Sequence, residues 1–272
     1  MIATGRSEDA LAELKREAGA ARLDVFRLDV TDPASIAHAL VAVERLTAGR
    51  GIDALVNNAG FGTAVPVAEI SDADLRAQFD TNVFGLVAMV RAFVPQMRAR
   101  GRGRIVNVSS IGGRMTLPFF GAYNGTKYAV ESLSDAMRCE LRPFGIEVSI
   151  VEPGGIRTNF AKTTVQTATG YHSPDSPYAA AHAKYMALAK RSDDFAAHPI
   201  VIARAIERAI TARRPRARYV APFFGGRVLL ALIRATPTRM LDWLFAQVLG
   251  LTKKKLATPA LPESKRARVL AS

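Results

Sequence analysis

The stretch GRIVNVSS, at residues 103–110, is a short apolar run that begins at glycine and ends in two serines. Similar runs occur before and after it, with longer helical patterns between them. Apolar runs that alternate with helices are typical of βαβ units, in which helices cover both faces of a parallel sheet. We therefore predict a doubly wound α/β fold. The predicted strands are 23–30, 53–60, 103–110, 146–155 and 217–222, and the predicted helices are 7–19, 33–49, 72–100, 122–143 and 199–213, with further apolar helices up to residue 250.

The length of 272 residues and the hydrophobic content of 49% favour one domain over residues 1–250. Residues 155–200 break the alternation and combine turn residues with an alanine-rich stretch, which predicts a segment that lies over a binding cleft. Residues 251–272 are polar, basic and contain proline, so we predict a disordered tail there.

Several classes of protein are excluded by simple counts. The single cysteine, Cys139, excludes an internal disulfide, and the four histidines show no zinc-ligand spacing, so we predict no metal site. The chain is charged within its first six residues, unlike a secretory signal, and the apolar stretch MLDWLFAQVLGL is too short to span a bilayer. We expect a cytoplasmic protein.

The net charge of +13 is concentrated near one end of the chain. Residues 201–272 hold 15 Lys and Arg against 3 Asp and Glu, a net charge of +12. Such a run favours a solubilising tail, and weak peripheral contact with a membrane stays open because Lys253 to Lys255 follow an apolar helix. We expect no nucleic-acid binding, since the late aromatic residues Trp243 and Phe245 are not interleaved with basic repeats and are predicted to pack in a core or pocket.

Small and polar residues follow three successive predicted strands. The segments NNAG (57–60), SS (109–110) and PGG (153–155) lie where those strands end. Each alone is explained as a turn. Ligands of open parallel sheets bind outside the carboxyl ends of the strands, so three such endings together favour a binding site at that edge.

Tyr123 and Lys127 lie one helical turn apart in GAYNGTKYAV (121–130), on one face of a predicted helix. A phenol titrates near pH 10, and a neighbouring ammonium would lower its pKa towards neutrality, where it could exchange protons. Ser110 ends a predicted strand thirteen residues earlier and could hold a substrate oxygen beside the tyrosine. A solvated pair on a surface helix is the alternative.

In this order and spacing, NNAG, NVSS, YNGTK and PGGIRT resemble the short-chain dehydrogenase/reductase family. The resemblance covers residues 1–160 and, more loosely, 199–250. It implies a Rossmann-like sheet and an oxidoreductase that interconverts a hydrophobic alcohol and its ketone or aldehyde by hydride transfer. It also implies a homodimer or homotetramer, formed through the helices at 72–100 and 122–143. A non-catalytic, dinucleotide-binding regulator of the same fold is the alternative.

The resemblance assigns a catalytic tetrad to Asn82, Ser110, Tyr123 and Lys127. Tyr123 would be the general acid or base, Ser110 would polarise the substrate oxygen, and Lys127 would bind the nicotinamide ribose and lower the pKa of the tyrosine. Asn82 would hold a water that relays protons to the lysine, unless its side chain merely bonds to its own helix. Ser109 competes for the role of the serine, and the thirteen-residue interval favours Ser110.

The family also implies where a dinucleotide would bind. Arg6 follows the strand that ends in ATGR, where it could pair with a 2′-phosphate, and no acidic residue is present there, so we favour NADP(H) over NAD(H). The expected cofactor-binding residues are Arg6, Asp29, Val30, Asn58, Ala59, Gly60, Tyr123, Lys127, Ile156 and Thr158.

One departure from the family is large. Its members begin with a strand and a glycine-rich turn that places the pyrophosphate on a helix N-terminus, and the first strand and first helix of that pattern are missing here. A sheet without this strand would expose two unpaired edges. We expect in-frame codons upstream of Met1 to encode the missing strand and turn; the alternative is that this chain binds the dinucleotide poorly.

Overall fold

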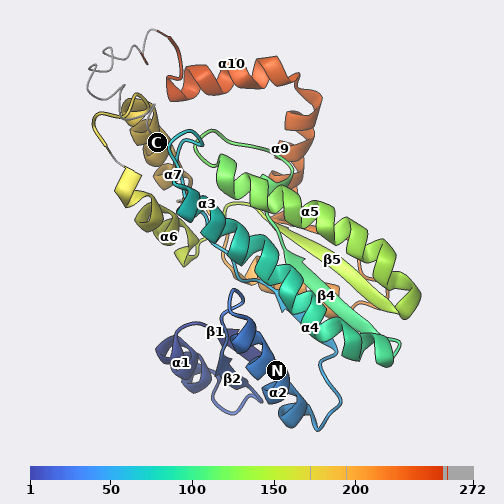
Figure 1. Cartoon of the computed structure of the whole chain (residues 1–272). Coiled ribbons are helices and arrows are strands. Elements are labelled where there is room, and N and C mark those ends of the chain that lie inside the picture. The colour runs from blue at the N-terminus through green and yellow to red at the C-terminus, as the bar shows by residue number, and fades with distance from the viewer. Residues whose placement is uncertain (172, 194, 254–255, 257–272) are drawn as a thin grey trace.

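The computed structural model describes residues 1–171, 173–193, 195–253 and 256, and Figure 1 shows its arrangement. Its strands are β1 (Ile2–Gly5), β2 (Asp24–Arg27), β3 (Ala54–Asn57), β4 (Gly103–Val108), β5 (Ile146–Pro153) and β6 (Arg218–Ala221). Its α-helices are α1 (Glu8–Ala18), α2 (Pro33–Thr47), α3 (Asp72–Phe79), α4 (Leu86–Ala99), α5 (Gly121–Leu141), α6 (Asn159–Ala168), α7 (Ala179–Asp193), α8 (Ile200–Thr211), α9 (Phe223–Ala235) and α10 (Thr238–Leu249). Shorter helical segments are η1 (Asp80–Gly85), η2 (Ile111–Gly113), η3 (Arg142–Phe144) and η4 (Thr169–Tyr171).

The strands are parallel, as predicted, and they form two sheets. One has the order β3-β4-β5-β6, and the other contains only β1 and β2. Within the described residues no strand pairs with the free edges of β1 and β3, which is the discontinuity that the sequence predicts. The β1–β2 unit, with α1 and α2, lies at the lower end of Figure 1, apart from the β4–β5 ribbon.

Helices cover both faces of the larger sheet. Successive side chains of a strand point to opposite faces, so each face packs against its own helices. Ile105 belongs to a core cluster with α4 and α5, whereas the next residue, Val106, packs against α8. Both side chains are fully buried. This explains why two successive residues of β4 are both apolar, as expected of a strand in a doubly covered sheet.

Helix α2 joins the two sheets. Asp32 caps its N-terminus by accepting a hydrogen bond from the Ala34 amide at 2.9 Å, and Pro33 occupies the first turn, as the sequence predicts. Ile36 and Val43 on its buried face share the main core cluster with residues of α4. The small unit is therefore held to the rest of the protein through helix packing.

The predicted helix 72–100 is continuous in space but contains a π-helical turn, η1, between α3 and α4. A π-helical turn is rare and often marks a functional position. Gly85 ends this turn against Val30, where an added Cβ would lie 2.7 Å from a methyl carbon of the valine. The close approach packs η1 against the segment that follows β2.

Residues 155–200, predicted only as a segment with turns and an alanine-rich stretch, contain α6 and α7. The apolar helices predicted up to residue 250 are α9 and α10, and α10 crosses the top of the molecule in Figure 1. No helix among the described residues is long and apolar enough to cross a membrane. Most of the predicted tail, 251–272, lies outside the described residues.

Candidate active site

Tyr123 and Lys127 project from the first turns of α5 into the protein interior. Their exposed fractions are 6% and 5%, which rules out the solvated surface pair. The Lys127 Nζ lies 5.7 Å from the centre of the Tyr123 ring and donates a hydrogen bond to the Val108 carbonyl at 2.9 Å. The helix therefore brings the phenol and the ammonium to the carboxyl end of β4.

Ser110, and not Ser109, lies beside the tyrosine. The Ser110 hydroxyl accepts a hydrogen bond from the Gly112 amide at 3.0 Å and interacts with the Tyr123 phenol. Ser109 is 3% exposed and its hydroxyl lies near Glu131, on the inner side of the loop. The backbone at Ser110 is extended, so the side chains of Ser109 and Ser110 point in different directions. Ser110, which the thirteen-residue interval favours, is the serine beside Tyr123.

Asn82 links three segments around the site. Its Oδ1 accepts from the Phe61 amide at 3.0 Å, and its Nδ2 donates to the Phe61 carbonyl at 2.8 Å and to Thr126 Oγ1 at 2.9 Å. The alternative that this side chain bonds only to its own helix is therefore wrong. Because its amide is bonded to protein atoms, Asn82 holds the loop after β3 against α5.

Burial controls the pKa values of the tyrosine and the lysine. Burial raises the pKa of Tyr123 to about 12, opposed by its hydrogen bond with Ser110. Its ring packs against Phe120 and Phe160, with centroid distances of 4.5 and 5.2 Å. Burial also lowers the pKa of Lys127 to about 8, opposed by Glu131. The expectation that Lys127 lowers the tyrosine pKa is wrong for this state of the protein, because the loss of hydration outweighs any effect of a cation 5.7 Å from the ring centre.

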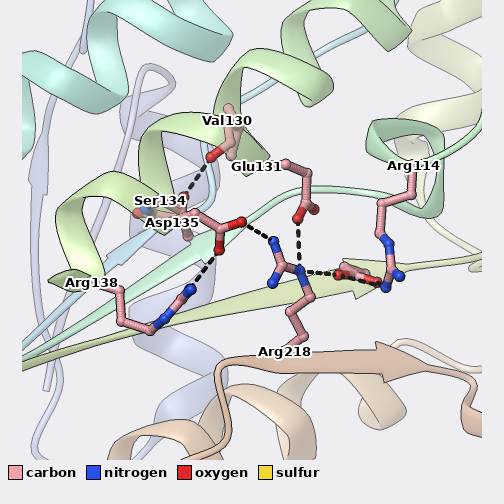
Figure 2. A network of polar contacts seen from close by, with 9 residues as sticks. Arg114, Val130, Glu131, Ser134, Asp135, Arg138 and Arg218 are labelled. Carbon is pink, nitrogen blue, oxygen red and sulfur yellow. Dashed lines mark hydrogen bonds and ion pairs between the residues drawn. The ribbon is translucent and has the colours of Figure 1, made fainter.

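A network of charged side chains includes Glu131, one helical turn after Lys127 on α5. Figure 2 shows Arg218 of β6 reaching towards α5. Arg218 Nε lies 3.1 Å from Glu131 Oε2 and 3.1 Å from Glu152 Oε1, and its Nη2 lies 2.6 Å from Asp135 Oδ2. Arg114 donates to both oxygens of Glu152, at 3.0 and 3.3 Å. The network thus ties α5 to β5, to β6 and to the loop that follows Ser110.

Sequence reasoning missed this network and the polar groups that support the site. Burial raises the pKa of Glu131, and Glu152 adds to the effect. Asn124 fixes the 110–117 loop by donating to the Gly112 carbonyl at 2.9 Å. A carboxylate one turn after Lys127, and Glu152 within an apolar strand, were signals that could have been noticed, but their arginine partners are distant in the sequence.

Comparisons with known proteins decide the family. The model of the short chain dehydrogenase family matches residues 1–169. The chain belongs to the short-chain dehydrogenase family. It is an oxidoreductase that acts on CH–OH donors with NAD(P). The Rossmann-like fold implied by the motifs is thereby confirmed.

Individual relatives of this dehydrogenase differ in what they bind. The chain is 34% identical, over 69% of its length and 68% of the relative, to a 3-ketodihydrosphingosine reductase of Bacteroides thetaiotaomicron. A short-chain dehydrogenase from Burkholderia phymatum in complex with NAD matches with a TM-score of 0.71 and 26% identity, over 86% of this chain and 82% of that one. The closed form of a serine dehydrogenase with NADP+ matches with a TM-score of 0.68 and 29% identity, over 80% and 83%.

The residues expected at the nicotinamide end of a dinucleotide lie together. Asn58, Ala59 and Gly60 are exposed and follow β3. An added Cβ at Gly60 would lie 3.0 Å from Asn82 Oδ1 and 3.4 Å from Lys127 Nζ, so the backbone passes close to both side chains. This half of the site fits the nicotinamide riboside, which the exposed loop and the lysine would hold.

The expected adenosine contacts lie on the small unit. Arg6 is exposed after β1 and lies close enough to Asp29 to act on its pKa, although hydrogen bonds from Thr31 are the main reason that this pKa is lowered. Val30 packs on η1, as described above. The expected adenosine residues are therefore grouped around the ends of β1 and β2.

The diphosphate part of the site is less complete. Thr158 caps α6 by accepting from the Phe160 amide at 3.3 Å, and Ile156 pairs with Ala197 in an isolated bridge, so both lie at the end of β5. Helix α1, which follows β1, begins with Glu8 and Asp9, and acidic residues do not favour a phosphate at a helix N-terminus. The described residues therefore fit the nicotinamide end of the dinucleotide and provide no glycine-rich phosphate turn. Among these same residues no cluster of ligands that could hold a metal is found.

Proposed function

We propose that this protein is an NADP(H)-dependent reductase that converts a hydrophobic ketone or aldehyde to its alcohol, with Tyr123 as the general acid. The observation that carries the proposal is the convergence of the Tyr123 phenol, the Ser110 hydroxyl and the Lys127 ammonium at the carboxyl end of β4. A buried phenol with a pKa of about 12 keeps its proton at neutral pH, and the protonated form is the one that carbonyl reduction needs.

Each side chain has a distinct part in this reaction. Reduction adds a hydride to the carbonyl carbon and a proton to the carbonyl oxygen, and the bound nicotinamide supplies the hydride. Ser110 donates a hydrogen bond to the substrate oxygen, and Tyr123 gives that oxygen its proton. Lys127, whose Nζ lies 5.7 Å from the centre of the Tyr123 ring, would hold the nicotinamide ribose. That Asn82 also orders a water for proton relay stays a prediction, since its hydrogen bonds to Phe61 and Thr126 are to protein atoms.

Two aromatic rings favour a hydrophobic substrate. Phe120 and Phe160 flank the Tyr123 ring, and Phe160 comes from α6 within the 155–200 segment. A cavity of about 220 Å³ between the loop after β3 and α7 is lined by Pro66, Tyr171 and Tyr178 among others, but by neither Ser110 nor Tyr123, so the two rings alone support an apolar substrate. The Bacteroides relative is named a 3-ketodihydrosphingosine reductase, which agrees with an apolar ketone beside these rings. We therefore propose that residues 155–200 close the substrate cleft.

The assay that tests the proposal follows NADPH oxidation with ketones of increasing chain length, with NADH in parallel. We expect turnover that rises with the apolar character of the ketone and a lower KM for NADPH than for NADH. Arg6→Asp should reverse the cofactor preference, because a carboxylate there would repel a 2′-phosphate. No ketone-dependent oxidation of either cofactor would contradict the proposed function, and an unchanged preference in the variant would contradict only the role of Arg6.

We also propose that two or four chains associate through α3, α4 and α5, as the family resemblance implies. Phe84 and Tyr128 are 61% and 45% exposed, and a hollow of about 420 Å³ lies beside Phe84. Sedimentation of the wild type and of Phe84→Ser tests this association. A variant that sediments as the wild type does would contradict a contact through this face.

A further inference from the structure

Helices α9 and α10 each present an apolar stripe to the outside. On α9, Val228, Leu229 and Leu232 are 54%, 38% and 61% exposed. An α-helix advances about 100° per residue, so these three positions lie on one side. Trp243 and Leu244 on α10 are 62% and 45% exposed. The prediction that Trp243 packs in a core or pocket is therefore wrong.

The opposite faces of the two helices already have their partners. Leu230 of α9 is 3% exposed, and Gly226 lies so close to β6 that an added Cβ would be 2.7 Å from Val220. Leu249 of α10 belongs to a buried cluster with Phe119. Because the inner face of each helix already packs against the protein, the exposed apolar stripe on its outer face is not needed for packing within the chain. Exposed apolar surface of this kind marks an interaction site.

The charges around the stripes indicate the kind of partner. Within residues 222–253 the ionisable residues are Arg227, Arg234, Arg239, Lys253 and a single acid, Asp242. All four basic residues are exposed. A symmetric contact between two copies would bring these like charges together, whereas an anionic bilayer would attract them. The whole C-terminal part of the sequence is basic, with a net charge of +12 over residues 201–272, which include both helices.

We propose that the outer stripes of α9 and α10 dock on the surface of an anionic lipid bilayer and lie within its interface. Apolar side chains with a tryptophan on one face and basic residues nearby are the pattern of a helix that lies in this interface. The two helices have 13 and 12 residues, about 20 Å each at 1.5 Å per residue, which is less than the roughly 30 Å of a hydrocarbon core. The helices therefore lie on the membrane and do not cross it.

The docking surface adjoins the active site. Helix α9 begins directly after β6, and an added Cβ at Gly226 would lie 3.6 Å from Ile111, the residue after Ser110. A bilayer at this surface would bring the carboxyl edge of the sheet near dissolved lipophilic ketones. Only this delivery of substrate rests on the proposed function, since the lipid contact itself requires no catalysis.

The test uses vesicles of phosphatidylcholine alone and vesicles in which about a third of the lipid is phosphatidylserine. Trp243 is the single tryptophan of the chain, so its fluorescence reports on this surface directly. We expect its emission to shift to the blue, and the protein to co-sediment, with the anionic vesicles. Leu232→Ser and Trp243→Ser should each weaken binding by about tenfold, and Arg234→Gln by about fivefold.

Val41→Ser is the matched control, because Val41 is 65% exposed on α2, away from both stripes, and this variant should bind as the wild type does. Thermal unfolding followed by circular dichroism checks that the exposed substitutions leave the fold intact. Failure to bind either kind of vesicle would overturn the proposal, as would binding that survives both stripe substitutions. Lipid-independent dimers that Leu232→Ser abolishes would overturn it in favour of self-association. NADPH oxidation measured without lipid separates this result from the proposed function.

Discussion

The two sheets of this protein differ in burial. The more buried sheet holds the proposed reacting groups, and the less buried one holds the proposed adenosine contacts. Strands β4 and β5 are buried over most of their lengths, whereas no residue of β1 or β2 is fully buried. Ser110 follows β4 of the larger sheet, and Tyr123 and Lys127 lie on α5, which packs on that sheet, while Arg6 and Asp29 follow the strands of the smaller one. The proposed reacting groups are thus held by the buried core, and the proposed adenosine contacts are held by a small unit attached through α2.

The largest expected effect tests the core side of this comparison. Tyr123→Phe removes the proposed proton donor and nearly preserves the shape, so we expect kcat for ketone reduction to fall by about 10²–10⁴-fold with little change in stability. Tyr128→Phe is the control, since Tyr128 lies on the same helix, is 45% exposed and should retain activity. Full activity in Tyr123→Phe would mean that another group supplies the proton.

The buried network gives the next largest effect. Arg218→Met leaves Glu131 and Glu152 without their shared cation, and removing one partner of a buried charge cluster costs about 3–5 kcal/mol of unfolding free energy. Urea unfolding at neutral pH measures the loss. Part of it should be regained at lower pH, because protonation removes the uncompensated carboxylate charges.

A matched surface pair serves as the control for that loss. Arg102 lies 3.8 Å from Asp53, and their side chains are 75% and 84% exposed. Arg102→Met should therefore cost no more than about 1 kcal/mol. Equal losses of unfolding free energy in Arg102→Met and Arg218→Met would show that the network stabilises the fold no more than an exposed ion pair does.

The third prediction concerns pH. The pKa of Lys127 falls from 10.5 in the unfolded chain to about 8 in the fold, so between these values the unfolded state binds more protons and stability rises with pH. Tyr123 acts in the opposite sense, but only between about pH 10 and 12, where the fold retains the proton. Lys127→Met should flatten the rise between pH 8 and 10, a difference of about 2–3 kcal/mol. An unchanged profile in the variant would mean that Lys127 is not the titrating group.

The sequence predicted the parallel α/β fold and the residues that meet at the end of β4, because strand periodicity and short motifs are local signals. It did not predict the raised pKa of Tyr123, which depends on Phe160 from a different helix. The Arg218–Glu131 pair joins residues 87 positions apart, and no spacing rule reveals such a contact. The π-helical turn at 80–85 was missed although DTNVFG consists of residues with low α-helix propensity, which is a signal of an irregular helix.

The smallest expected effect tests whether the small unit is a separate cooperative part. Asp32→Ala removes the N-terminal cap of α2, which should cost about 1 kcal/mol. If the unit opens by itself, hydrogen exchange of α2 amides should quicken by about fivefold while β5 amides, in the most buried strand, keep their rates. Ser71→Ala, which removes the corresponding cap of α3, is the control that should leave α2 unchanged. Equal acceleration in α2 and β5 would show that the core cluster shared by α2 and α4 joins both sheets into one unfolding unit. The two sheets would then hold different proposed contacts but would not unfold separately.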